Sequence, residues 1–113
     1  MAKLTAVLHG DFKSIVRDLT DTVLNGSYSA SEEDTAYFSK DGVRCYMGVF
    51  ERYSYTGQNR VSMSITLFGD NEKSDLCVIT SGGSTGLLFK LNTFGEEAFL
   101  ETIEKSVQKY EIR

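Results

Sequence analysis

The hydrophobic pattern of this 113-residue chain changes its period twice, and this change limits the folds open to it. Near both ends, apolar residues recur every three to four positions, which is typical of helices that bury one side. Between residues 35 and 80 apolar and polar residues alternate, which is typical of strands with one buried face. No proline interrupts either pattern. The chain is therefore expected to combine two helices with a β-sheet.

The first helix is predicted at residues 11–25. Asp11 is a good N-cap, because its carboxylate can accept hydrogen bonds from the free N–H groups of the first turn. Asn25-Gly26 offers the left-handed residue at which many helices end. The apolar stripe consists of Phe12, Ile15, Val16, Leu19 and Val23.

The second helix is predicted at residues 94–110. Thr93 and Glu96 have the spacing of a capping box, in which the two side chains satisfy backbone N–H groups at the start of a helix. Its apolar stripe consists of Phe99, Leu100, Ile103, Val107 and Tyr110.

Strands are predicted before and between these helices. Residues 27–34 are polar and acidic and are expected to form a connecting loop, while Asp41-Gly42 is a strong hairpin turn. The predicted strands cover residues 3–9, 35–40, 43–54, 60–68 and 76–80, with a further short strand at 87–91.

The predicted strand 43–54 has apolar residues on both faces. Val43 and Cys45 share one face, while Tyr46 and Phe50 share the other. If the two aromatic rings are exposed, their face is a candidate dimer interface or ligand surface. A curved sheet that wraps a helix would explain the same pattern without a binding surface.

Short turns between consecutive strands make those strands antiparallel neighbours. We therefore expect one α+β domain over residues 1–113, with two layers: an antiparallel sheet of about five to six strands and two helices on one face. This order of elements resembles the TATA-box-binding-like fold, and a shortened helix-grip fold is the alternative.

Composition excludes several kinds of partner and cofactor. The chain has 12 Lys+Arg against 16 Asp+Glu, and this net charge of −4 argues against general nucleic-acid binding.

No stretch approaches the roughly 20 apolar residues of a membrane-spanning helix, and no export signal is recognised. We therefore expect a cytoplasmic protein with reduced thiols at Cys45 and Cys77. His9 and the two cysteines are too few for a structural zinc site, and no metal or cofactor is expected.

No catalytic constellation stands out. His9 is the only histidine, there is no nucleophile elbow, and no two carboxylates have a spacing that would place them in one pocket. The Gly-rich segment 81–86 lacks the lysine of a phosphate-binding P-loop. It is either a nest of backbone N–H groups for an anion or a bulged connection. The sequence therefore favours a protein that is not an enzyme.

The densest polar and aromatic cluster is the hairpin 51–60, which surrounds the predicted turn at residues 56–59. Arginine and tyrosine near one turn suit a carboxylate, a phosphate or an acidic strand of a partner. The alternative is a solvated hairpin whose arginines pair with Glu51 or another neighbour. Together with the Gly-rich segment, the candidate ligand- or partner-binding residues are Arg52, Tyr53, Tyr55, Arg60, Ser81, Gly82, Gly83 and Ser84.

Three segments carry a resemblance to a known family. They are Leu24-Asn25-Gly26-Ser27, then Glu51-Arg52-Tyr53-Ser54 with Asn59-Arg60-Val61-Ser62, and Thr80-Ser81-Gly82-Gly83-Ser84 leading to Asn92-Thr93-Phe94-Gly95-Glu96. Over nearly its whole length the chain resembles a family of small proteins of unknown function from Gram-positive anaerobic and related bacteria. The resemblance implies a stand-alone cytoplasmic protein, and it implies no activity, cofactor or catalytic residue.

Three functions remain open on this evidence. The first is a non-enzymatic module that binds a small ligand or a protein, with a homodimer formed through the sheet. The second is a small helix-grip enzyme with a pocket between the sheet and the C-terminal helix. The third is a subunit whose sheet edge or solvent face docks another chain.

Overall fold

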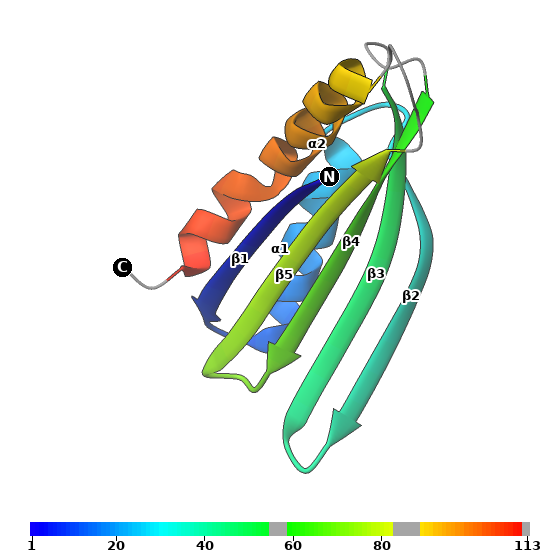
Figure 1. Ribbon diagram of the computed structural model, residues 1–113. Helices are drawn as coiled ribbons and strands as arrows, with labels where there is room; N and C mark the ends of the chain where they lie inside the picture. The colour runs from blue at the N-terminus through cyan, green and yellow to red at the C-terminus, as the bar shows by residue number, and fades with distance from the viewer. Residues whose placement is uncertain (55–58, 83–88, 112–113) are drawn as a thin grey trace.

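A computed structural model describes residues 1–54, 59–82 and 89–111 (Figure 1). It confirms the predicted α+β class, with an antiparallel five-stranded sheet and two helices. The elements in chain order are β1 (Ala2–His9), α1 (Phe12–Asn25), β2 (Ser31–Lys40), β3 (Val43–Ser54), β4 (Asn59–Gly69), β5 (Lys73–Gly82) and α2 (Phe89–Tyr110).

The strands lie in the order β1-β5-β4-β3-β2, and every neighbouring pair is antiparallel. Strands β2 to β5 follow one another across the sheet, and β1 pairs with β5, so β1 and β2 form the two edges. The predicted hairpin turn is confirmed, because Lys40 pairs with Val43 and both turn residues have positive φ (Asp41 52°, Gly42 82°). This geometry is that of a tight two-residue turn matched to the twist of the strands.

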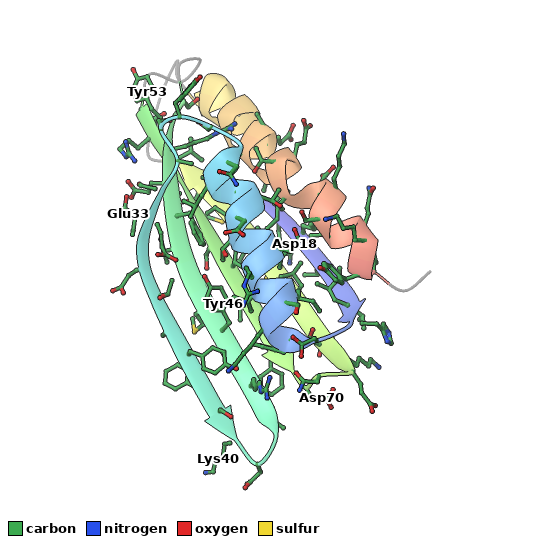
Figure 2. All side chains as sticks on the ribbon, turned by 180° about the vertical axis from the view of Figure 1, so that it is seen from behind. Asp18, Glu33, Lys40, Tyr46, Tyr53 and Asp70 are labelled. Carbon is green, nitrogen blue, oxygen red and sulfur yellow. The ribbon has the colours of Figure 1, made fainter. Side chains whose placement is uncertain are left out.

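Both helices lie on the same side of the sheet, as the view from behind shows (Figure 2). We call this side the covered face and the opposite side the open face. Side chains of the covered face pack with the apolar stripes of both helices, and alternate residues of β4 confirm the predicted period of two. The core consists of Leu8, Phe12, Ile15, Leu19, Val23, Tyr46, Phe50, Val61, Met63, Ile65, Leu67, Leu76, Val78, Phe99, Leu100, Ile103 and Val107.

Helix α1 begins and ends as predicted, but its C-cap residue has a different backbone conformation from the expected one. The Asp11 carboxylate accepts hydrogen bonds from the Ser14 N–H (3.1 Å) and hydroxyl (2.8 Å), which confirms the N-cap. Gly26 was expected to be left-handed, but its φ is −78°. Its lack of a side chain instead permits close approach, since a Cβ there would lie 3.2 Å from the Thr22 carbonyl oxygen and 3.4 Å from Thr102.

Helix α2 begins earlier than predicted, so the expected strand at 87–91 is wrong for residues 89–91, and residues 87–88 lie outside the described part. The predicted capping box is also wrong, because Thr93 and Glu96 lie inside the helix. Glu96 is buried and accepts hydrogen bonds from the Gly82 N–H (2.8 Å) and the Met1 ammonium group (2.7 Å). Its carboxylate thus joins α2 to the ends of β5 and β1 rather than to its own first turn.

Strand β2 also begins earlier than predicted, because the acidic segment expected to be a loop pairs with β3. Ser31 pairs with Glu51 and Glu32 with Phe50, and the register shifts between Glu32 and Asp34. Every residue of β2 except Ser31 is exposed, so these charges stay in water. Charges and a bulge on an edge strand hinder pairing with the edges of other sheets.

Candidate functional site

The open face is the most distinctive surface of the described chain. Monomeric soluble proteins rarely expose large contiguous apolar patches, so such a patch marks an interaction surface. Six large apolar side chains, each between 37% and 62% exposed, point from four strands of the open face: Val7, Phe38, Val43, Met47, Val49 and Phe68.

The strand registers place these side chains in cross-strand rows. One row runs from Val7 through Asp75, Phe68 and Cys45 to Phe38. The next row runs from Thr5 through Cys77, Thr66 and Met47 to Ala36, and it contains no charged residue. The centre of the open face is therefore nearly neutral and partly apolar.

Charged strand residues lie on the same face, and their signs balance; most of them surround this centre, whereas Asp75 lies within the first row, between Val7 and Phe68. Arg60 is already paired, since its Nε lies 2.8 Å from a Glu51 carboxylate oxygen and one Nη lies 3.9 Å from Glu33. The cations on this face are Lys3, Lys40, Arg60 and Lys73, and the anions are Glu33, Asp34, Glu51 and Asp75. A neutral centre with a mixed-charge rim is the ordinary anatomy of a protein–protein interface.

The open face carries hollows as well as exposed apolar side chains. A hollow of about 510 Å³ lies between β1, β5 and β4, and its lining includes Val7, Thr66, Phe68 and Cys77. Smaller hollows of about 200 Å³ and about 120 Å³ lie over β2, β3 and β4. Raised aromatic side chains beside shallow hollows allow an opposing surface to interdigitate.

The exposed side of β3 is not the side that carries Tyr46 and Phe50, which the sequence had offered as a candidate surface. Tyr46 is 6% exposed and Phe50 is 0% exposed, because both lie on the covered face under the helices. Val43 and Met47 lie on the other face and are exposed. The suggested surface built on Tyr46 and Phe50 is therefore wrong, and the exposed surface is formed by the aliphatic side of the strand.

The predicted binding residues are divided between the two faces. Tyr53 and Arg60 pair across β3 and β4 on the open face, and Ser81 lies on the same face, where its carbonyl oxygen accepts a hydrogen bond from Ser62. Arg52 and Gly82 lie on the covered face, in one row with Val61 between them. Tyr55, Gly83 and Ser84 lie outside the described residues.

Arg52 lies in an unusual position for an arginine. Its guanidinium carbon is 4.8 Å from the centre of the Phe99 ring of α2, a cation–π contact. Burial lowers the pKa of Arg52 below its ordinary value, yet an arginine remains charged at neutral pH. Among the residues described, no carboxylate oxygen lies within 4.0 Å of this guanidinium group. Within the described ranges, this half-buried charge therefore has no counter-charge within 4.0 Å.

Asn59 lies two residue pairs from Arg52 along the β3–β4 ladder, on the same covered face. It pairs with Ser54 in the register, while Arg52 pairs with Val61. The Asn59 Oδ1 atom is buried, and no residue of the described part of the chain donates a hydrogen bond to it. Arg52 and Asn59 are therefore diagonal neighbours across β3 and β4 on the covered face.

The space between α2 and the sheet is occupied by apolar side chains. Phe99 and Ile103 are 0% exposed and Val107 is 2% exposed, and all three belong to the core. Within the described ranges, no group of three or more His, Cys, Asp or Glu side chains is arranged to hold a metal ion. In the same part of the chain, neither helix has the length and apolar character needed to cross a membrane.

Comparison with known proteins identifies a family for this chain. Residues 1–111 match the model of a family described as "Family of unknown function (DUF6054)". No curated protein and no solved structure matches the chain. Because the family model covers almost every residue of the sequence, the chain belongs to this family of unknown function.

Proposed function

We propose that the chain is a non-enzymatic protein-binding module and that its open face binds the open face of a second copy. The observation that carries this proposal is the group of six exposed apolar side chains on the helix-free side of the sheet. Burial of apolar surface is the main favourable term in protein association. A two-fold contact would cover these side chains in both copies at once.

The size of the open face supports a stable contact. Five strands spaced about 4.8 Å apart, each contributing about eight residues of 3.3 Å, give a flat area of about 600 Å² per copy. Two copies would cover about 1,200 Å² before side-chain relief is counted, and stable interfaces begin near this area.

The charges of the open face favour a second copy over a strongly charged partner. Its strand residues include four cations and four anions around a nearly neutral centre. A surface with balanced signs can oppose itself without placing like charges together, whereas a single-sign surface repels its own copy. The net charge of −4 per chain adds only a weak, salt-screened repulsion.

The finer structural proposals follow from the same elements. The order β-α-β-β-β-β-α supports a TATA-box-binding-like fold over a shortened helix-grip fold.

Cys45 and Cys77 are free, and strand β4 lies between their strands. Two strand spacings, about 9.6 Å, exceed the reach of a disulfide, which is consistent with a reducing cytoplasmic location.

Sedimentation velocity over a range of concentrations tests self-association. We expect the wild-type chain to sediment as a dimer at about 50 µM and to dissociate on dilution, and we expect Phe68→Lys to remain monomeric because it places a charge in the apolar centre. Tyr28→Lys is the matched control, since Tyr28 is a fully exposed aromatic residue outside the open face. A wild-type monomer at this concentration, or a dimer unaffected by Phe68→Lys, would contradict the proposal.

A further inference from the structure

The open face carries opposite charges at its two edges, and this arrangement limits how a second copy can lie on it. One cross-strand row runs from Lys3 on β1 through Ile79, Ser64 and Val49 to Asp34 on β2. Strands β1 and β2 are the two edges of the sheet (Figure 1). Both end residues are exposed, and within the described ranges neither has an oppositely charged group within 4.0 Å.

Two sheets that meet face to face with aligned strands can be related by a two-fold axis in two ways. An axis parallel to the middle strand, β4, keeps each row opposite its own copy and exchanges the edges, so that β1 lies over β2 of the second copy. An axis at right angles to the strands keeps each strand opposite itself and exchanges the rows about the central one. Different residues face one another in the two arrangements, so the surface itself can favour one of them.

The charges favour the axis parallel to β4. This axis places Lys3 opposite Asp34 of the second copy, and the symmetry makes the same contact twice. An axis at right angles, through the row of Thr66, would place Lys3 opposite Val7 and Asp34 opposite Phe38. Opposite charges attract across an interface, whereas a charge pressed against an apolar side chain loses water and gains no partner.

The relief of the open face favours the same axis. The hollow of about 510 Å³ over β1, β5 and β4 is lined in part by Cys77, and the axis parallel to β4 places Met47 of the second copy opposite Cys77. The Met47 side chain is 45% exposed and can enter this hollow. An axis at right angles would leave the hollow facing its own copy. It would also press Asp75 against Ile79, whereas the parallel axis gives Asp75 the Cys45 thiol, a weak donor.

On the basis of the proposed self-association, we infer that the two copies are related by an axis parallel to β4 and that Lys3 and Asp34 select this orientation. Each copy places its β1 over β2 of the other, so both charge pairs form at the margins of the contact. The pair is closed, because the same surface of both copies is used at once and none of it is left for a third.

Two single charge reversals test this orientation. Lys3→Glu and Asp34→Lys each place like charges at both contacts of a homodimer, so we expect each to raise the dimer Kd by about tenfold or more. In a mixture of the two variants every contact joins opposite charges again. Native mass spectrometry of an equimolar mixture, with one chain ¹⁵N-labelled, counts the pairs. We expect the mixed pair to exceed either homodimer by about tenfold or more, against about twofold for random pairing.

Lys13→Glu and Asp21→Lys are the matched control, because they change the net charge by the same amounts at exposed positions of α1, away from the open face. These two chains should pair at random, and a preference as strong as that of the test pair would contradict the contact. Wild-type dimers combined with random pairing of Lys3→Glu and Asp34→Lys would overturn the orientation and leave self-association standing. A wild-type monomer would contradict self-association and the orientation together, so the two failures are distinguishable.

Discussion

The aromatic ring of Tyr46 lies over the backbone of Gly48 on the covered face of β3. A Cβ atom on Gly48 would be only 2.9 Å from the Tyr46 Cζ atom and 3.0 Å from the Phe50 Cε1 atom, and it would overlap the Tyr46 hydroxyl. Glycine normally weakens a strand interior, and one reason to find it there is the close approach of another group. Here Gly48 makes room for two aromatic side chains between the sheet and α1 (Figure 2 labels Tyr46).

Replacing Gly48 with alanine should therefore destabilise the fold. We expect Gly48→Ala to lower the free energy of unfolding by about 1–3 kcal/mol, the usual cost of overpacking a core. Urea unfolding followed by circular dichroism measures it. In a Tyr46→Leu background the same substitution should cost less, because the ring that it meets is gone. An equal cost in both backgrounds would show that Tyr46 is not the obstacle.

The Tyr46 hydroxyl should make stability depend on alkaline pH. This oxygen is buried, and it has no hydrogen-bond partner among the residues that the structure describes. Burial, with a smaller contribution from the charge of Glu32, raises the pKa of Tyr46 to about 12. An unfolded tyrosine loses its proton near pH 10, so the folded state holds that proton more tightly between pH 10 and 12. The contribution to stability is complete below pH 10 and is lost as the pH rises through this window.

Tyr46→Phe isolates that effect. At pH 7 the variant should be as stable as the wild type or more stable by about 1 kcal/mol, since it removes an unsatisfied buried hydroxyl. Between pH 10 and 12 the wild type should lose stability relative to Tyr46→Phe. Urea unfolding of both proteins at pH 8 and pH 11 measures the difference, and parallel pH dependences would contradict this assignment.

Asp18 links the two helices and should make stability depend on acidic pH. Its carboxylate accepts hydrogen bonds from the Lys109 ammonium (3.0 Å) and the Tyr110 hydroxyl (2.8 Å). These bonds, Lys109 first, hold the pKa of Asp18 below its ordinary value of 3.8. The stabilisation is therefore present above pH 3.8 and is lost as the pH falls through the lower folded-state pKa.

Asp18→Asn should cost about 0.5–1.5 kcal/mol at pH 7, the range of one or two partly exposed polar contacts. Denaturant unfolding of the two proteins at pH 7 and again near pH 2.5 provides the comparison. Asp21→Asn is a suitable control, because Asp21 is exposed on the same helix. The difference between wild type and Asp18→Asn should shrink at low pH, and a difference that grows there would refute the contact.

Ile103 tests how α2 packs on the sheet. Its side chain is 0% exposed and belongs to the core that joins α2 to the covered face. Ile103→Ala should reduce the free energy of unfolding by about 2–5 kcal/mol through lost burial and the cavity that remains. Glu101→Ala, at an exposed position of the same helix, serves as the control in the same thermal melts. Unchanged melting of Ile103→Ala would mean that α2 does not pack as described.

The parts of the fold that could be predicted from the sequence are those in which local signals agree. In α1 the Asp11 cap and the apolar stripe point to the same helix, and in β4 the alternation of Met63 and Ile65 with polar residues gives the buried side directly. Where local signals compete with tertiary contacts, the prediction was wrong. The acidic residues of β2 form a strand because β3 offers them backbone partners, which no local preference reveals.

The start of α2 was wrongly predicted, and the exposed side of β3 was left open, for related reasons. Glu96 had the spacing of a capping residue, but it is buried against the Gly82 N–H, a group 14 residues away in the chain. Both sides of β3 carry apolar residues, so periodicity alone could not say which one the helices cover. The bulky side chains at Tyr46 and Phe50, with Gly48 between them, are the signal that indicates the buried side.

The candidate residues around the predicted turn at 56–59 share a polar and aromatic composition, and composition does not specify a face of the sheet. Alternation along β3 sends Arg52 to the covered face and Tyr53 to the open face, so neighbours in sequence belong to different surfaces. Val43, Met47 and Val49 alternate along one side of β3, a pattern that is equally typical of a buried face. The exposure of this side depends on where the helices lie, which is a property of the whole fold.

Intermolecular contacts across the open face are most directly measured by isotope-filtered NMR on a mixture of ¹³C-labelled and unlabelled chains. We expect nuclear Overhauser effects between copies at the methyl groups of Met47 and Val49, and none at those of Ile103 in the core. Intermolecular effects confined to the helices, or their complete absence in a concentrated sample, would contradict pairing through the open face.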